Sequence, residues 1–130
     1  MHASVLGAIL AVFAMTAISG CSSQTTPTLG AEDSGREVTV QRGQTLTIEL
    51  KANPSTGYSW EFVESKGAIL KQLGEPEFEA ESDLLGAPGM QTLRFEAVEA
   101  GQMELRLVYR RPWETDVEPV DTFTLIVTVQ

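Results

Sequence analysis

Histidine and cysteine are almost absent from this chain of 130 residues. The one histidine, His2, and the one cysteine, Cys21, both lie near the N-terminus. Hydrolysis of the Ser-His-Asp or Cys-His type needs a base with a pKa near neutrality, and zinc and copper sites normally use His or Cys ligands. Because the rest of the chain lacks these groups, we expect no enzyme activity, no metal site and no cofactor.

Basic residues are scarce as well. Nine Lys and Arg stand against 18 Asp and Glu, so the formal net charge is -9. This acidic excess repels the phosphates of nucleic acids and the surfaces of anionic lipids. We therefore expect no nucleic-acid partner, and we expect membrane attachment only through a lipid anchor.

Long apolar runs are confined to the N-terminus, where Val5–Ile18 is short for a membrane span and typical of an export signal. Small residues, Ser19 and Gly20, directly precede Cys21, as in the sites that lipoprotein signal peptidases read. We predict a signal peptide over residues 1–20, lipidation of Cys21, and export to the cell envelope, on the periplasmic face of the outer membrane if the source is Gram-negative. The alternative is a buried helix with an incidental cysteine.

The residues after Cys21 have few large apolar side chains. Ser, Thr, Gln, Pro and Gly dominate Ser22–Gly35, and such a composition is typical of a flexible segment. We therefore predict a tether over residues 21–35 and one monomeric domain over residues 36–130, a length that suits a single hydrophobic core.

Residues 36–130 contain short runs in which apolar and polar side chains alternate with a period of two. Leu46, Ile48 and Leu50 form one apolar row, and Phe123, Leu125, Val127 and Val129 form another. This period is typical of strands with one buried face, and we see no helical stripe. The pattern predicts an all-β protein, an immunoglobulin-like antiparallel β-sandwich of about seven strands.

An acidic stretch interrupts this series, with carboxylates at alternating positions from Glu75 to Asp83. It could be a cation site, but it lacks the spaced Asp and Asn ligands and the glycine of a calcium loop. We favour a solvated edge strand, because charge along an edge discourages pairing with other molecules.

Three connections between the expected strands contain unusual residues. In an immunoglobulin-like topology they are the B–C, D–E and F–G loops, which gather at one end of the sandwich. The two leucines of the second segment could be core or an exposed rim, and Trp113 could fold back onto the sandwich or face a partner. The segments are Asn53-Pro54-Ser55-Thr56-Gly57-Tyr58, Leu84-Leu85-Gly86-Ala87-Pro88-Gly89 and Tyr109-Arg110-Arg111-Pro112-Trp113-Glu114.

These motifs, in this order, resemble those of the chagasin-type inhibitors of papain-like cysteine proteases. The resemblance extends from about Val38 to Val129 and includes Trp60 and Ala100-Gly101. It implies a reversible, tight-binding protein inhibitor whose three loops enter the active-site cleft of the protease. The protease-binding residues implied are Asn53, Pro54, Ser55, Thr56, Gly57 and Tyr58 in the first loop, Leu85, Gly86, Ala87, Pro88 and Gly89 in the second, and Arg111, Pro112 and Trp113 in the third.

The resemblance also assigns places in the cleft. Pro54–Gly57 would lie at the catalytic centre, Leu85–Gly89 on the non-primed side, and Arg111–Trp113 on the primed side. The alternative function is that of a non-inhibitory, immunoglobulin-like envelope lipoprotein that acts as an interaction or assembly module, because a fold does not determine a function.

Overall fold

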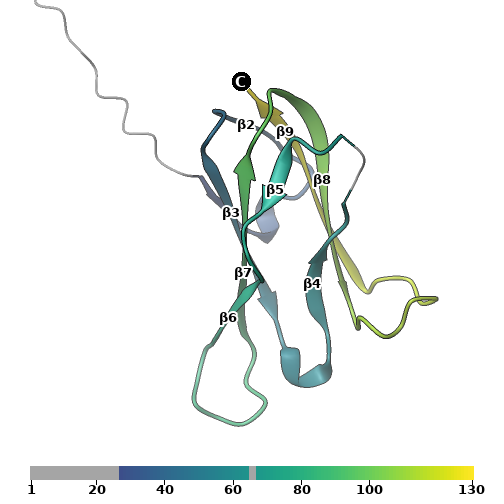
Figure 1. Cartoon of the computed structure of the whole chain (residues 1–130). Helices are drawn as coiled ribbons and strands as arrows, with labels where there is room; N and C mark the ends of the chain where they lie inside the picture. The colour runs from purple at the N-terminus through teal and green to yellow at the C-terminus, as the bar shows by residue number, and fades with distance from the viewer. Residues whose placement is uncertain (1–26, 65–66) are drawn as a thin grey trace, which may run out of the picture.

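The computed structural model describes residues 27–64 and 67–130, which form a sandwich of two β-sheets (Figure 1). The five-stranded sheet has the order β1-β3-β7-β5, with β6 also paired to β7, and the four-stranded sheet has the order β2-β9-β8-β4. The strands are β1 (Thr28–Leu29), β2 (Glu37–Val40), β3 (Thr45–Ala52), β4 (Ser59–Phe62), β5 (Leu70–Gln72), β6 (Glu77–Ala80), β7 (Gly89–Ala97), β8 (Gly101–Arg110) and β9 (Asp121–Val129), and the short 3-10 helices are η1 (Ala31–Asp33) and η2 (Pro54–Thr56).

The all-β sandwich is thus confirmed, with the immunoglobulin-like arrangement of β3 and β7 facing β8 and β9. Most pairings are antiparallel, whereas β1 with β3 and β2 with β9 are parallel. No helix in the described part of the chain is both long and apolar enough to cross a membrane.

Alternation of side chains builds the core between the two sheets. Along β7 every second residue is buried, and the inward residues of β3 and β9 follow the same period. Phe95 and Phe123 are the largest of the fully buried side chains, and Phe62 meets the edge of the Phe95 ring at 5.0 Å between centroids. Because two apolar faces close on each other, the core leaves the outer faces polar.

The acidic stretch is an edge strand, as the sequence predicts. All four residues of β6 are exposed, and β6 pairs only with β7 among the described strands. Glu77 forms an exposed ion pair with Arg94 at 2.9 Å. The stretch therefore protects the edge of the sheet with charge.

The segment before residue 36 differs from the sequence prediction. The described part of the expected tether, residues 27–35, lies against the sandwich: β1 pairs with β3, and Asp33 is buried. The Asp33 carboxylate accepts hydrogen bonds from the Gly30 amide and the Arg36 guanidinium, both at 3.0 Å. Composition misled here because backbone pairing with β3, the carboxylate of Asp33 and one apolar side chain, Leu29, which packs against the core, are enough to hold this segment. The domain therefore includes residues that we assigned to the tether.

Candidate functional site

The strand register brings three connections to the same end of the sandwich. Ala52, at the end of β3, pairs with Gly89, which in turn pairs with Ala80 of β6. In the other sheet, Arg110 pairs with Ser59 of β4. The first loop (residues 53–58), the second loop (residues 84–89) and the third loop (residues 111–114) therefore lie together, at the lower end of the molecule in Figure 1, opposite the C-terminus.

The first loop is a tight turn held by its own hydrogen bonds. Thr56 N donates to Asn53 O at 3.1 Å, and Gly57 N donates to Pro54 O at 2.9 Å. The Thr56 hydroxyl also donates to Asn53 O at 2.6 Å, and Ser55 donates to the Asn53 side chain. Gly57 has a φ of 85°, which an L side chain rarely adopts. Proline and glycine thus hold the tip in one conformation without help from a partner.

Arg111 joins the third loop to the first. Its Nε donates to Thr56 O at 3.0 Å, its guanidinium carbon lies 4.5 Å from the centre of the Tyr58 ring, and its NH1 pairs with Glu114 at 3.0 Å. The hydrogen bond with Glu114 raises the pKa of Arg111 above its ordinary value. The third loop is therefore fixed relative to the first.

Trp113 forms a second contact between these loops. Its side chain is 68% exposed, yet a Cβ atom on Gly57 would collide with the far edge of its indole ring. The far edge of the indole thus contacts the first loop, while most of the side chain is exposed to solvent. Of the two possibilities left open by the sequence, the structure favours the exposed one.

The second loop lies beside the first. Asn53 Nδ2 donates to Gly86 O at 3.4 Å, and a Cβ atom on Gly86 would lie 3.7 Å from the Ser55 hydroxyl. Leu84 and Leu85 project into solvent, with exposures of 77% and 105%. The two leucines therefore form an exposed rim and take no part in the core.

Gly89 has a different position from the rest of its segment. It is the first residue of β7 and is buried, and a Cβ atom there would collide with the backbone of Glu79 in β6. Its backbone closes the base of the second loop, where two strands approach too closely for a side chain. The structure therefore moves Gly89 from the exposed tip to the sheet.

An aromatic and polar network supports the loops from below. Tyr109 stacks on Trp60 at 5.1 Å between ring centres, and its hydroxyl accepts a hydrogen bond from Asn53 N at 3.0 Å. Gln91 is buried and bonds to both backbone groups of Trp60: Trp60 N donates to Gln91 Oε1 at 2.9 Å, and Gln91 Nε2 donates to Trp60 O at 3.2 Å. The base of the first loop is thus tied to both sheets.

Sequence reasoning did not identify Gln91 as part of this site. A signal was present, because Gln91 occupies the same alternating row as Leu93, Phe95 and Ala97. A polar residue in a core row requires a hydrogen-bond partner. The identity of that partner, the backbone of the opposite sheet, follows only from the tertiary structure.

The chemistry of this end of the molecule is that of a binding surface. Over residues 27–64 and 67–130 there is no cluster of His, Cys, Asp and Glu that could hold a metal ion. The loops instead offer backbone groups, hydroxyls, two exposed leucines and an exposed tryptophan. Cys21, the lipidation site predicted from the sequence, lies outside the described residues.

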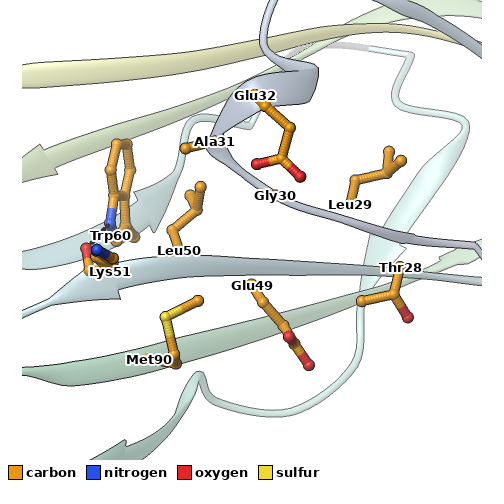
Figure 2. A pocket seen from close by; sticks show the side chains of 10 residues that line it. All are labelled: Thr28, Leu29, Gly30, Ala31, Glu32, Glu49, Leu50, Lys51, Trp60 and Met90. Atoms are coloured by element: carbon orange, nitrogen blue, oxygen red, sulfur yellow. Dashed lines mark hydrogen bonds between the residues drawn. The ribbon is translucent and has the colours of Figure 1, made fainter. Parts of the chain in front are cut away.

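A separate hollow of about 370 Å³ lies between the β1–η1 segment and β3 (Figure 2). Its lining includes two carboxylates, Glu32 and Glu49, and the edge of Trp60, whose Nε1 donates to Lys51 O at 3.0 Å. None of its lining residues belongs to the three loops, so the hollow is not part of the loop surface. The lining residues are Thr28, Leu29, Gly30, Ala31, Glu32, Glu49, Leu50, Lys51, Trp60 and Met90.

Comparisons with known proteins show the family of this chain. Residues 39–127 match the family model described as Chagasin family peptidase inhibitor I42. Chagasin from Trypanosoma cruzi is 32% identical over 95 residues, 70% of this chain and 86% of chagasin. The cysteine protease inhibitor EhICP2 from Entamoeba histolytica has a similar crystal structure, with a TM-score of 0.69 and 25% identity over 79% of this chain and 94% of that one. PbICP-C, solved in complex with falcipain-2, has a TM-score of 0.52 and 21% identity over 83% of this chain and 93% of that one.

Proposed function

Because this chain belongs to the chagasin family and is an inhibitor of papain-like cysteine proteases, we propose that its three loops fill the active-site cleft of the protease. The observation that carries the proposal is the set of contacts that join the loops into one surface, from Arg111 to Thr56 and from Asn53 to Gly86. Family membership also decides between the two functions that the sequence left open. The chain is a protease inhibitor and not an enzyme. The alternative function, that of a non-inhibitory envelope lipoprotein, is therefore rejected.

Each loop has a proposed place in the cleft. Pro54–Gly57 occupies the catalytic centre of the protease, where Thr56 makes the closest polar contacts. Leu85 and the glycine-bounded tip after it reach the non-primed side, and Pro112 and Trp113 cover the primed side. The high exposure of Trp113 supports its role, because tryptophan is one of the residue types that dominate interface energies. Leu85 is exposed as well and adds apolar surface beside the tip of the second loop.

Rigidity explains how such a surface binds tightly and reversibly. Association costs free energy whenever loops must be ordered, and these loops are already ordered by hydrogen bonds within and between them. A standard interface of about 1,600 Å² can then give tight binding. We therefore expect a one-to-one complex with a monomeric inhibitor.

Titration of papain with the purified protein tests the proposal. We expect stoichiometric, reversible inhibition of papain and no inhibition of trypsin. The loops are proposed to fit the cleft of a papain-like protease, and they do not inhibit by reacting with the nucleophile of any protease. Papain activity that is unchanged by an excess of folded protein would exclude the proposed function.

We also propose that the protein is exported and held in the envelope by a lipid on Cys21, with cleavage after Gly20. The small residues before Cys21 and the apolar run Val5–Ile18 support this. The described chain starts beside the Thr45 end of β3, where Thr47 N donates to Pro27 O at 3.1 Å. The loops follow the other end of β3, so an anchored molecule presents them away from the membrane.

Membrane fractionation of cells that make the full chain tests the anchor. We expect wild type in the membrane fraction and Cys21→Ser in the soluble fraction, with unchanged inhibition of papain in both. Ser22 after the lipidated cysteine favours the outer membrane in a Gram-negative cell. A Cys21→Ser variant that stays in the membrane fraction would contradict lipid anchoring.

A further inference from the structure

The peptide bond between Thr56 and Gly57 has both of its polar groups engaged inside the protein. Its carbonyl oxygen accepts a hydrogen bond from Arg111 Nε at 3.0 Å, and its N–H donates to Pro54 O at 2.9 Å. A cysteine protease needs the carbonyl oxygen, which must enter the oxyanion hole, while the N–H bond to Pro54 O holds the turn that fixes the orientation of this peptide. The carbonyl at the centre of the first loop is therefore already bonded within the molecule.

Arg111 is itself held in place by groups on both sides. The Tyr58 ring lies beneath its guanidinium at 4.5 Å, and Glu114 pairs with NH1 at 3.0 Å. The planar guanidinium can meet a carbonyl, a carboxylate and an aromatic face at once, which an ammonium cannot do with the same geometry. The side chain is thus used for contacts within the molecule, although its position in the third loop implied a contact with the protease.

We propose that Arg111 is a positioning residue that keeps the Thr56 carbonyl turned toward the third loop and so prevents the bound protease from cutting the first loop. The proposal rests on the proposed function and explains why a loop at the catalytic centre acts as an inhibitor. Trp113 supports the same arrangement, because its indole lies against Gly57 and hinders rotation of the Thr56–Gly57 peptide.

Loss of this hydrogen bond would open the ordinary reaction of the protease. The thiolate attacks the Thr56 carbonyl carbon, the Gly57 nitrogen leaves with a proton from the enzyme's histidine, and water then hydrolyses the thioester to a carboxylate. The net change is one water added across one peptide bond. It yields two fragments that end at Thr56 and begin at Gly57.

The test incubates the full chain with a catalytic amount of active papain and follows residual inhibition and fragment masses over time. We expect wild type to stay intact and Arg111→Ala to lose inhibition with cleavage at Thr56–Gly57, at least about tenfold faster than wild type, because a charge-assisted hydrogen bond is lost. Arg110→Ala is the matched control. Arg110 is the residue before Arg111, and its guanidinium pairs with Glu61 of β4 at 3.0 Å. Its ion pair is therefore with a strand, whereas Arg111 bonds to the first loop.

Two further variants, with a measurement of folding, distinguish the positioning role of Arg111 from the effect of its charge and from a loss of folded protein. Arg111→Lys keeps the charge and should still be cut faster than wild type, whereas a purely electrostatic contact with the protease would leave it uncut. Glu114→Ala removes one support of Arg111 and should accelerate cleavage in wild type but not in the Arg111→Ala background. Thermal unfolding of each variant shows whether cleavage comes from the folded state.

The outcomes distinguish this inference from the proposed function. If wild type does not inhibit papain, both are overturned. If wild type inhibits and folded Arg111→Ala remains intact while binding more weakly, the function stands and the positioning role is wrong. Cleavage of Arg111→Ala at another bond would also overturn the role assigned to Arg111.

Discussion

At the scale of single residues, Gly57 is the point where the first loop contacts Trp113 of the third loop. This contact is possible only because glycine has no Cβ atom. Its φ of 85° is unfavourable for any side chain, and a Cβ atom would collide with Trp113. We expect Gly57→Ala to lower stability by about 1–2 kcal/mol through the backbone and to weaken papain inhibition through the displaced indole. Inhibition titrations and thermal unfolding measure the two effects.

Gly35 offers a matched control for this substitution. It has the same φ of 85°, and a Cβ atom there would have nothing within 4 Å. Gly35→Ala should therefore show the stability loss without the loss of inhibition. Equal inhibition by both variants would mean that the contact between Gly57 and Trp113 does not contribute to binding.

Trp113 is the second residue whose role can be measured directly. Its indole is 68% exposed and lies at the loop end of the sandwich. We expect Trp113→Ala to weaken binding to papain by about 2 kcal/mol or more, roughly 30-fold in Kd, as exposed aromatic side chains at interface centres typically do. Val117, an exposed apolar residue of the same connection, provides the control Val117→Ala. A loss below about 0.5 kcal/mol would count against the role of the third loop.

At the scale of elements, Gln91 connects β7 with β4 across the two sheets. Its side chain pairs with both backbone groups of Trp60, on the side of β4 that faces away from β8. We expect Gln91→Leu to lower the free energy of unfolding by about 2 kcal/mol or more, because two buried backbone groups lose their partners. Urea denaturation measures the change.

Gln102 on β8 provides the control for the Gln91→Leu substitution. Its side chain is exposed and bonds to Thr128 at 3.2 Å. Gln102→Leu should change stability by less than about 0.5 kcal/mol, as surface substitutions usually do. Similar losses for the two variants would show that the bonds between Gln91 and Trp60 add nothing specific.

Elements were the most predictable part of this chain. The period of two along β3, β7 and β9 was visible in the sequence because each strand has one face against the core. The segment containing β1 and η1 was not visible, because it is held by pairing with β3 and by the contacts of Asp33. Neither interaction leaves an apolar pattern that a sequence can reveal.

At the scale of the whole molecule, the N-terminal segment and the loops occupy different regions. Removal of residues 27–35 takes away β1 and the buried Asp33, so we expect a loss of about 1–3 kcal/mol and a lower Tm by several degrees. Papain inhibition should persist below the new Tm, since the backbone bonds of these residues to the sheets are made with β3 and β9. Thermal unfolding of chains that start at Pro27 and at Arg36 provides the comparison, and equal Tm values would mean that the segment adds no stability.

The sequence by itself determined the sandwich, its main alternating strands and the three turned segments between them. It could do so because burial of one strand face, proline and glycine act locally and leave a periodic or short-range pattern. Tertiary structure alone decided that Arg111 turns inward to the Thr56 carbonyl, that Leu84 and Leu85 form an exposed rim, and that Gly89 lies in the sheet. These outcomes depend on which distant segments meet at one end of the sandwich, and that meeting is set by the pairing of strands far apart in the chain.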